Sequence, residues 1–343
     1  MTKTERFFSS LTSRSVDRYT TSPEGILSEE ITIVLEDQDT LNKVCGMNDV
    51  NLRVIEKHLH SRIFCRGNEL TLSAVEPGSK DLFRSLIDEL LSRITTGQHP
   101  DEHLVSSIME SLAKGEKEEV SRLKELSIDI PRGPKIFPRS MRQASYVEGM
   151  TGHDISFAIG PAGTGKTYLA VAFALQEILE KRKKKLILTR PVVEAGESLG
   201  FLPGDLGQKI QPYLRPLYDA MDSLIPVELI TKMEESRIIE IAPLAYMRGR
   251  SLKNSLIILD EAQNTTKEQM KMFLTRIGEG SKAIITGDIT QIDLPKHITS
   301  GLIHAKKVLD PLEEIHFSTL DARDVVRHPI VKKIVQAYEK EES

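Results

Sequence analysis

Two series of apolar and polar positions divide the chain. Between residues 26 and 95, runs of alternating apolar positions, typical of half-buried strands, are interspersed with stretches whose apolar residues recur at helical spacing. The expected elements are strand 31–36, helices 38–45 and 50–59, strands 61–66 and 69–75, and helix 79–94. This order predicts a small α+β domain at residues 26–95.

Residues 140–343 follow a different pattern, in which the strands are continuous apolar runs. These runs are 155–159, 186–188, 256–259 and 283–286, and helical stretches separate them. Strands that are apolar at nearly every position are typical of parallel sheets covered by helices on both faces. We therefore expect an α/β domain with a mainly parallel sheet.

Polar and proline-rich segments flank these two domains. Residues 1–25 are rich in Ser, Thr and charged side chains, and we expect them to be flexible. A charged helical stretch follows the first domain, and three prolines within 131–138 exclude a continuous helix there. We assign residues 96–139 to a helical connector and proline-rich linker.

Composition narrows the class of protein only a little. The formal net charge is −4 over 343 residues, so a contact with nucleic acid requires a local basic patch. No apolar run has the length of a signal peptide or approaches the ~20 residues of a membrane span, so we expect a cytoplasmic protein without membrane contact. Cys45 and Cys65 lack the spacing of a zinc site or of a disulfide framework.

The segment 160–167 follows the first apolar strand of the α/β domain and opens a helical stretch. Its residues are Gly160, Pro161, Ala162, Gly163, Thr164, Gly165, Lys166 and Thr167. They form a P-loop motif, in which glycines permit positive φ and backbone N–H groups converge on phosphate at the helix N-terminus. Lys166 is expected to reach the β- and γ-phosphates, and Thr167 to bind Mg²⁺.

Two later strand ends carry the groups that nucleotide hydrolysis requires. The run 256–259 ends in Asp260 and Glu261, which predicts Asp260 as a second Mg²⁺ ligand and Glu261 as the general base for the attacking water. The run 283–286 leads into a Gly-Asp turn and Gln291, which suits a group that orients the attacking water or senses the γ-phosphate, and we assign Gln291 to sensing. This order resembles motifs I, II and III of superfamily 1 helicases and implies a RecA-like P-loop NTPase. A small-molecule kinase is disfavoured, because its substrate would bring its own hydroxyl nucleophile.

Further side chains around the P-loop are candidates for ligand contacts. Gln143 and Tyr146 lie about twenty residues before the loop, where helicase-like ATPases place a glutamine that reads adenine. By that resemblance Gln143 binds the adenine edge and Tyr146 packs on the base, whereas an ordinary amphipathic helix is the alternative. Arg190 follows the next strand and is a candidate contact for an RNA phosphate. The basic run 181–185 is better explained by the C-terminal end of a helix, where cations offset the helix dipole.

Several motifs together carry a closer resemblance. They are the segments 160–167, 189–197, 199–205 and 324–328. In this order they resemble the PhoH-like ATPase family over about residues 130–340. The resemblance implies ATP and Mg²⁺ as ligands, a role in RNA metabolism on single-stranded RNA, and an endoribonuclease as partner. Members of the family in some bacteria are described as inducible by phosphate starvation.

The order of elements in residues 26–95 resembles a type I KH domain. In that domain a GxxG loop between the first two helices clamps nucleotides through backbone N–H groups. Here the loop is Gly46-Met47-Asn48-Asp49, and the carboxylate of Asp49 would repel phosphate. An RNA clamp and a structural or oligomer-contact role therefore both stay open for this KH-like domain.

The length of the α/β domain bears on assembly. Only 52 residues follow Gln291, whereas a second motor domain needs about 100 or more. Helicases complete the ATP site with an arginine from a second domain, so we expect this arginine to come from a neighbouring subunit of a homo-oligomer such as a hexameric ring. The candidates are Arg248, Arg250, Arg323 and Arg327. Arg327 is equally suited to sensing the γ-phosphate within its own chain.

These observations predict an α/β, RecA-like P-loop NTPase at residues 140–343 with a KH-like N-terminal domain. Its expected reaction is Mg²⁺-dependent hydrolysis of ATP coupled to the binding, remodelling or unwinding of RNA. The alternative is an ATP-gated switch or adaptor for an RNA-processing partner, without movement along RNA.

Overall fold

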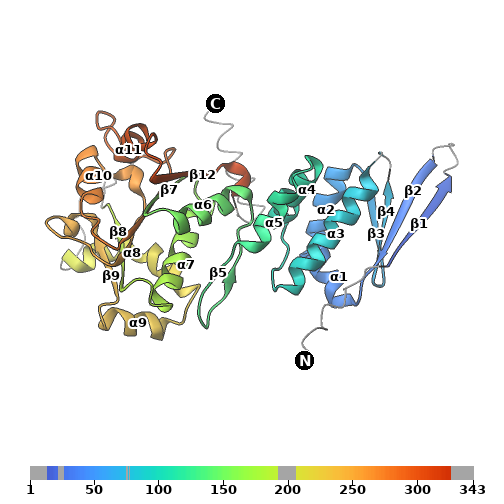
Figure 1. Ribbon diagram of the computed structural model, residues 1–343, viewed down its shortest axis with the longest axis horizontal. Helices are drawn as coiled ribbons and strands as arrows, with labels where there is room; N and C mark the ends of the chain where they lie inside the picture. The colour runs from blue at the N-terminus through green and yellow to red at the C-terminus, as the bar shows by residue number, and fades with distance from the viewer. Residues whose placement is uncertain (1–13, 22–26, 75, 77, 192–205, 326–343) are drawn as a thin grey trace, which may run out of the picture. The chain divides into compact units, whose positions relative to one another are not determined.

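The computed structural model describes residues 14–21, 27–74, 76, 78–191 and 206–325 (Figure 1). The chain divides into two compact units, Met1–Glu125 and Leu126–Ser343. None of the helices in the described ranges is both long and apolar enough to cross a membrane.

The first unit packs helices on a four-stranded antiparallel sheet (Figure 1). Its strands are β1 (Arg14–Thr21), β2 (Leu27–Val34), β3 (Arg62–Arg66) and β4 (Glu69–Ala74), and they lie in the order β1-β2-β4-β3. Its helices are α1 (Gln38–Cys45), α2 (Val50–Leu59), α3 (Ser79–Thr95), α4 (Glu102–Ala113) and α5 (Lys117–Glu125). From β2 to α3 the elements follow the predicted order, and the bounds of α1 and α2 agree with the prediction.

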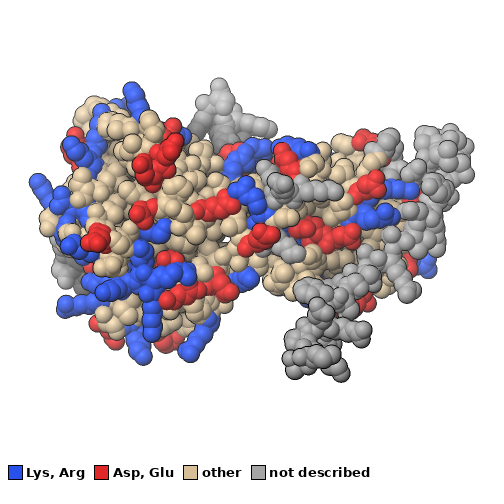
Figure 2. Space-filling view, viewed as in Figure 1, with Lys and Arg blue, Asp and Glu red and all other residues tan. Residues whose placement is uncertain are grey.

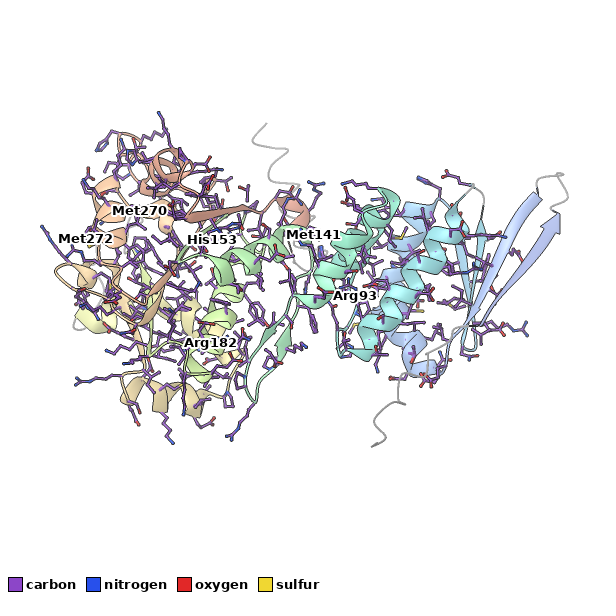
Figure 3. The ribbon with its side chains drawn as sticks, viewed as in Figure 1. Arg93, Met141, His153, Arg182, Met270 and Met272 are labelled. Atoms are coloured by element: carbon purple, nitrogen blue, oxygen red, sulfur yellow. The ribbon has the colours of Figure 1, made fainter. Side chains whose placement is uncertain are left out.

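The structure places the limits of the first unit elsewhere than the sequence pattern does. Residues 14–21, expected to be flexible, form β1 and pair with β2 over their full length. Helices α4 and α5, expected in a connector at 96–139, contribute Leu104, Ile108 and Val120 to the core of this unit. The fully buried Arg93 of α3 (Figure 3) joins them, because its guanidinium donates to the carbonyl of Val120 at 2.5 Å. The connector helices thus complete the first domain.

The second unit is built on a six-stranded parallel sheet in the order β12-β7-β11-β10-β8-β9. Its strands are β7 (Ile155–Ile159), β8 (Lys185–Arg190), β9 (Ile239–Pro243), β10 (Ser255–Leu259), β11 (Lys282–Gly287) and β12 (Ile315–Thr319). Its helices are α6 (Met141–Gly152), α7 (Lys166–Leu179), α8 (Leu206–Asp222), α9 (Val227–Glu235), α10 (Lys267–Leu274) and α11 (Gly301–Leu309). A short hairpin of β5 (Ile128–Asp129) and β6 (Lys135–Ile136) precedes them.

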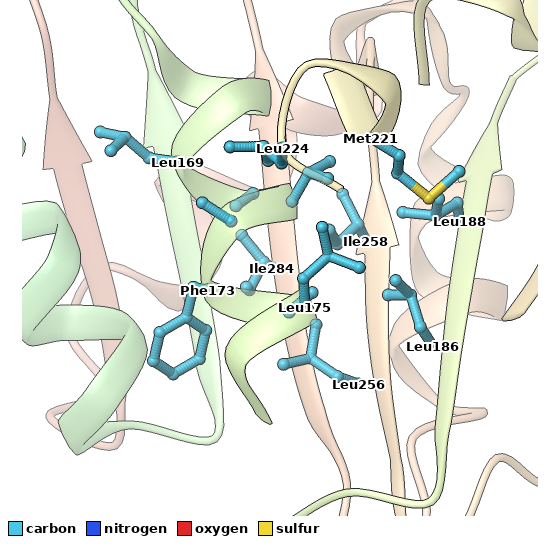
Figure 4. Packing of buried hydrophobic residues seen from close by; sticks show 14 of the residues in the cluster. Leu169, Phe173, Leu175, Leu186, Leu188, Met221, Leu224, Leu256, Ile258 and Ile284 are labelled. Carbon is cyan, nitrogen blue, oxygen red and sulfur yellow. The ribbon is translucent and has the colours of Figure 1, made fainter. Parts of the chain in front are cut away.

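Helices cover both faces of this sheet, as the continuous apolar runs predict. In β10, Leu256 and Ile258 pack against α7 and α8 on one face (Figure 4), whereas Ile257 and Leu259 pack against α10 and α11 on the other. All four side chains are fully buried. The central strands are therefore held from both sides, which fixes the positions of their ends.

The parallel arrangement brings the carboxyl ends of all six strands to one edge of the sheet. Ligands bind at this edge in open α/β sheets. The P-loop follows β7, the Asp-Glu pair follows β10, and the Gly-Asp turn begins at the end of β11. Neighbouring ends are tied together, since the Gly160 N–H donates to the Gly287 carbonyl at 3.1 Å and the Asp260 N–H to the Thr189 carbonyl at 2.9 Å.

Candidate active site

The P-loop turns from β7 into the N-terminus of α7. Gly163 and Gly165 both have φ of +81°, a conformation that side chains other than glycine rarely adopt. The Lys166 ammonium folds back over the loop and donates to the carbonyls of Gly160 and Pro161 at 2.6 and 2.8 Å. The loop thus surrounds a positive charge and directs a helix N-terminus toward the strand edge.

Asp260 is held by two hydroxyl groups. Its Oδ1 accepts hydrogen bonds from Thr167 Oγ1 at 2.8 Å and from Thr286 Oγ1 at 2.6 Å. Asp260 and Thr286 are buried, at 5% and 0% exposure. The structure brings the predicted Mg²⁺ ligands Thr167 and Asp260 together and adds Thr286, which the sequence pattern treated only as the last residue of a strand.

Glu261 lies beside Asp260 and is held at both carboxylate oxygens. Its Oε1 accepts from Arg190 Nη2 at 2.9 Å, and its Oε2 accepts from Gln263 Nε2 at 2.6 Å. Parallel pairing sets Thr189 opposite Leu259, which places Arg190 next to the two acids. Arg190 also lies 3.5 Å from Asp260 and donates to the Tyr213 carbonyl of α8 at 2.8 Å.

Two adjoining hollows lie at this edge. The phosphate cleft, of about 250 Å³, is lined by Ala162, Gly163, Gly165, Lys166, Thr167, Tyr168, Asp260, Glu261, Gly287, Asp288 and Gln291. The Arg190 pocket, of about 430 Å³, is lined by Arg190, Pro191, Tyr213, Glu261, Gln263, Asn264, Thr290, Gln291, Ile292 and Asp293. Glu261 and Gln291 belong to both linings, so they separate the two hollows.

The oxygen atoms of the phosphate cleft suit a magnesium ion. Mg²⁺ in nucleotide sites prefers a hydroxyl or one to two carboxylates together with phosphate oxygens and water. Thr167 and Asp260 supply these groups, and Asp288 Oδ2 is a buried carboxylate oxygen with no hydrogen-bond partner among the described residues. No group of three or more His, Cys, Asp or Glu side chains within the described ranges forms a metal site that is independent of a nucleotide.

Gln143 and Tyr146 lie beneath the P-loop. The Gln143 amide donates to the Thr164 carbonyl at 3.1 Å and accepts from the Arg139 N–H at 2.8 Å, so both of its ends bind backbone. Tyr146 is 0% exposed and donates to the Lys166 carbonyl at 3.3 Å, and burial raises the pKa of its phenol well above the ordinary value. The expectation that Tyr146 packs on adenine is therefore wrong, because its ring faces the core.

Tyr168 is the aromatic residue that the structure brings to the phosphate cleft instead. It lies on α7, is 36% exposed, and contributes to the lining beside the P-loop glycines. The sequence feature that could have predicted this position is that Tyr168 directly follows Thr167 on the first turn of the helix. Gln263, which binds Glu261, gave no such signal, since it lies in the short turn after β10.

The arginines predicted as candidates for completing the ATP site have different surroundings in the structure. Arg250 forms a two-point ion pair with Glu240, at 2.5 and 2.8 Å, which lowers the pKa of that carboxyl. Arg323 pairs with Asp321 at 2.8 Å, and Arg248 is exposed. Arg327 lies outside the described residues, as do segments 192–205 and 326–328 of the family motifs.

For the loop 46–49 of the first unit, both predicted roles stay open: an RNA clamp, and a structural or oligomer contact. Asn48 and Asp49 both have positive φ, 54° and 59°, and Met47 is 84% exposed. Arg53 on α2 donates to the Asn48 carbonyl at 3.0 Å. Asp49 thus stands in place of the second glycine with a positive φ that glycine adopts more readily, and both alternatives stay open.

Comparisons with known proteins agree with the motifs. A family model described as "PhoH-like protein" matches residues 135–339. A PhoH-like protein of Mycobacterium tuberculosis (strain ATCC 25618 / H37Rv) is 48% identical over 300 residues, which cover 88% of this chain and 85% of that one. A PhoH-like protein of Bacillus subtilis (strain 168) is 48% identical over 308 residues, with 90% and 96% covered.

Among solved structures, the Pif1 helicase from Candida albicans aligns with 57% of this chain and 42% of its own, at 13% identity and a TM-score of 0.30. The family model covers more than half of the chain, and the two bacterial relatives match it along most of their length. The chain therefore belongs to the PhoH-like protein family, and its second unit is a P-loop NTPase.

Proposed function

We propose that the protein hydrolyses ATP to ADP and phosphate with Mg²⁺ and couples this reaction to single-stranded RNA. The observation that carries the proposal is the position of Glu261, which lines the phosphate cleft beside Asp260 and also faces the Arg190 pocket. A carboxylate next to the Mg²⁺ ligand suits water as the nucleophile, because it can accept the proton that the water loses.

Each group at the strand edge has a role in this reaction. Lys166 binds the β- and γ-phosphate oxygens, and Thr167 and Asp260 hold the metal. Mg²⁺ bound there supplies positive charge to the phosphate oxygens in the transition state. Glu261 orients and deprotonates the water, and the exposed Gln291 side chain reports the γ-phosphate to the adjoining pocket.

The contacts of Gln143 bear on two roles, shaping the P-loop and binding adenine. Its amide is bound to the backbone on both sides of the P-loop, which supports a role in shaping the loop. Binding adenine, as the resemblance to helicase-like ATPases implies, requires it to exchange one of these two hydrogen bonds.

RNA binding and assembly are parts of this proposal, and an ATP-gated switch is its alternative. The resemblance of the motifs to the PhoH-like ATPase family implies RNA metabolism, and Arg190 places a positive charge at the strand edge. Figure 2 shows Lys and Arg side chains over the second unit although the total charge is −4, but these alone do not locate an RNA site. A homo-oligomer, such as a hexameric ring, supplies an arginine to the neighbouring phosphate cleft. The described residues contain one parallel sheet with a P-loop, which also suits an ATP-gated switch for an endoribonuclease partner.

Steady-state ATP hydrolysis with and without single-stranded RNA tests the proposal. We expect hydrolysis that requires Mg²⁺, rises with RNA and is lost in Lys166→Ala. In Glu261→Gln we expect turnover to fall at least about 100-fold with nucleotide binding retained, since general-base catalysis contributes that much. The matched control is Glu279→Gln, an exposed glutamate in neither hollow, which should hydrolyse normally. Full activity in Glu261→Gln contradicts the proposal, and hydrolysis without RNA unwinding favours the switch.

A further inference from the structure

We propose that the Arg190 pocket binds a phosphodiester of single-stranded RNA, and that this binding takes the Arg190 guanidinium away from Glu261. Glu261 then has a free carboxylate oxygen for the attacking water, so RNA accelerates hydrolysis by releasing the general base. The coupling rests on the proposed function, whereas the binding site can be tested without it.

The contacts of Arg190 are those of a side chain shared between elements. One end of its fork donates to Glu261 at 2.9 Å, and the other donates to the Tyr213 carbonyl of α8 at 2.8 Å. The guanidinium is 14% exposed and lines the pocket, so a ligand there reaches it without unfolding any element. Arg190 is thus a positioning residue that acts through Glu261.

Glu261 is restrained on both sides in this arrangement. Arg190 occupies one carboxylate oxygen, and Gln263 occupies the other at 2.6 Å. Gln263 is itself fixed, because its Oε1 accepts from the Asp288 N–H at 3.0 Å and its Nε2 also donates to the Gln291 carbonyl at 3.1 Å. Arg190 is therefore the more readily exchanged of the two partners of Glu261.

The pocket offers a guanidinium for a phosphodiester and an aromatic ring for a base. A guanidinium fork binds two phosphate oxygens at once, which competes with its single hydrogen bond to Glu261. Tyr213 in the lining offers an aromatic side chain on which a base can stack. Asn264 and Thr290 add hydrogen-bonding groups for sugar and phosphate. Asn264 donates to the Asp293 carboxylate at 3.1 Å, and because this carboxylate keeps its charge, the phosphate has to lie on the Arg190 side of the pocket.

Binding is measured first, with the full chain and without nucleotide. The probe is a fluorescent single-stranded oligouridylate, followed by anisotropy. We expect Arg190→Gln to weaken binding about tenfold or more, because it removes a charge-assisted contact to phosphate. Arg190→Lys should recover part of the affinity, since it keeps the charge and loses the fork.

Arg182→Gln is the matched control, because Arg182 (Figure 3) also lies between two acids, Glu177 and Glu180, but at the other end of α7. We expect its affinity for RNA to stay within about twofold of the unmodified chain. Unchanged binding in Arg190→Gln, or an equal loss in Arg182→Gln, overturns the site. Displacement of the RNA by polyglutamate at lower concentration than by unlabelled RNA assigns the pocket to an acidic peptide and also overturns it.

Hydrolysis is measured second, on the same variants. Arg190→Gln should hydrolyse ATP without RNA faster than the unmodified chain, and RNA should no longer stimulate it. RNA stimulation that persists in Arg190→Gln overturns the release of Glu261. No hydrolysis by the unmodified chain, together with RNA binding that depends on Arg190, contradicts the proposed function and leaves the binding site standing. Thermal unfolding of each variant verifies the fold, and Arg190→Lys carries the test if Arg190→Gln unfolds.

Discussion

The hydroxyl of Thr286 should be required to hold Asp260 for metal binding, and Thr286→Val removes it with little change of shape. Thr286 Oγ1 donates to Asp260 Oδ1 at 2.6 Å, and both side chains are buried. Valine keeps the branched shape that the strand accommodates. The substitution therefore tests one hydrogen bond to a buried carboxylate.

The expected loss follows from the type of bond. A hydrogen bond to a charged group contributes about 1.5–3 kcal/mol to the free energy of unfolding. In a unit of this size that corresponds to a fall in Tm of roughly 3 to 12 °C. If Asp260 binds Mg²⁺ as proposed, Thr286 would orient this ligand without touching the metal, and the apparent affinity for Mg²⁺ in ATP hydrolysis should fall about 10- to 100-fold.

The strand on the other side of β10 offers a matched control. Thr189 of β8 is also 0% exposed, and its hydroxyl has no hydrogen-bond partner among the described residues. Thr189→Val should therefore cause no loss of stability, since it replaces an unpaired buried hydroxyl by a methyl group. Thermal unfolding and Mg²⁺ titration of both variants decide the matter. Equal behaviour of Thr286→Val and Thr189→Val would refute the reasoning, because shape alone would then explain both.

Two further substitutions test the packing and the charge of the second unit. Gly149→Ala should lower the free energy of unfolding by about 1–3 kcal/mol, because its Cβ would lie 2.1 Å from the His316 ring. Gly152→Ala in the same helix is the control: its Cβ meets nothing within 4 Å, so this variant should be neutral or stabilising. Denaturant unfolding of the pair checks this, and equal stability contradicts it. Arg250→Gln should cost about 1 kcal/mol at pH 7. Its hydrogen bond lowers the pKa of Glu240, so the deficit should shrink and disappear as the pH falls through that lowered pKa, and a deficit that does not shrink on acidification contradicts the assignment.

Local periodicity was sufficient to predict much of the fold. The apolar spacing of 38–45 and 50–59 gave helices with the observed bounds, because these signals depend only on neighbouring residues. The strand β1 and the membership of α4 and α5 in the first core depend on contacts between distant segments. Polar sequence at 14–21 gave no sign of the pairing with β2 that orders it.

In the site, too, short motifs could be predicted from the sequence, whereas contacts between distant segments could not. The P-loop and the Asp-Glu pair are short motifs whose spacing carries their chemistry, and the structure brings them to one edge. Tyr146 was misplaced because distance along the chain does not reveal which face of α6 is buried, and Tyr146 shares the buried face with Gln143. Arg190 was expected to meet a ligand, but the register of β8 against β10 was needed to reveal its contact with Glu261.

The charge of the phosphate cleft links nucleotide binding to assembly. Lys166 is the one cationic side chain among the described residues of its lining, whereas Asp260, Glu261 and Asp288 are acidic. A triphosphate in this cleft therefore meets repulsion that the backbone N–H groups and Lys166 offset only in part. Mg²⁺ held by Thr167 and Asp260 would supply further positive charge, and the described lining offers no second cationic side chain for the γ-phosphate. We therefore propose that an arginine completes the cleft in the active form, supplied in trans by a homo-oligomer or in cis by Arg327.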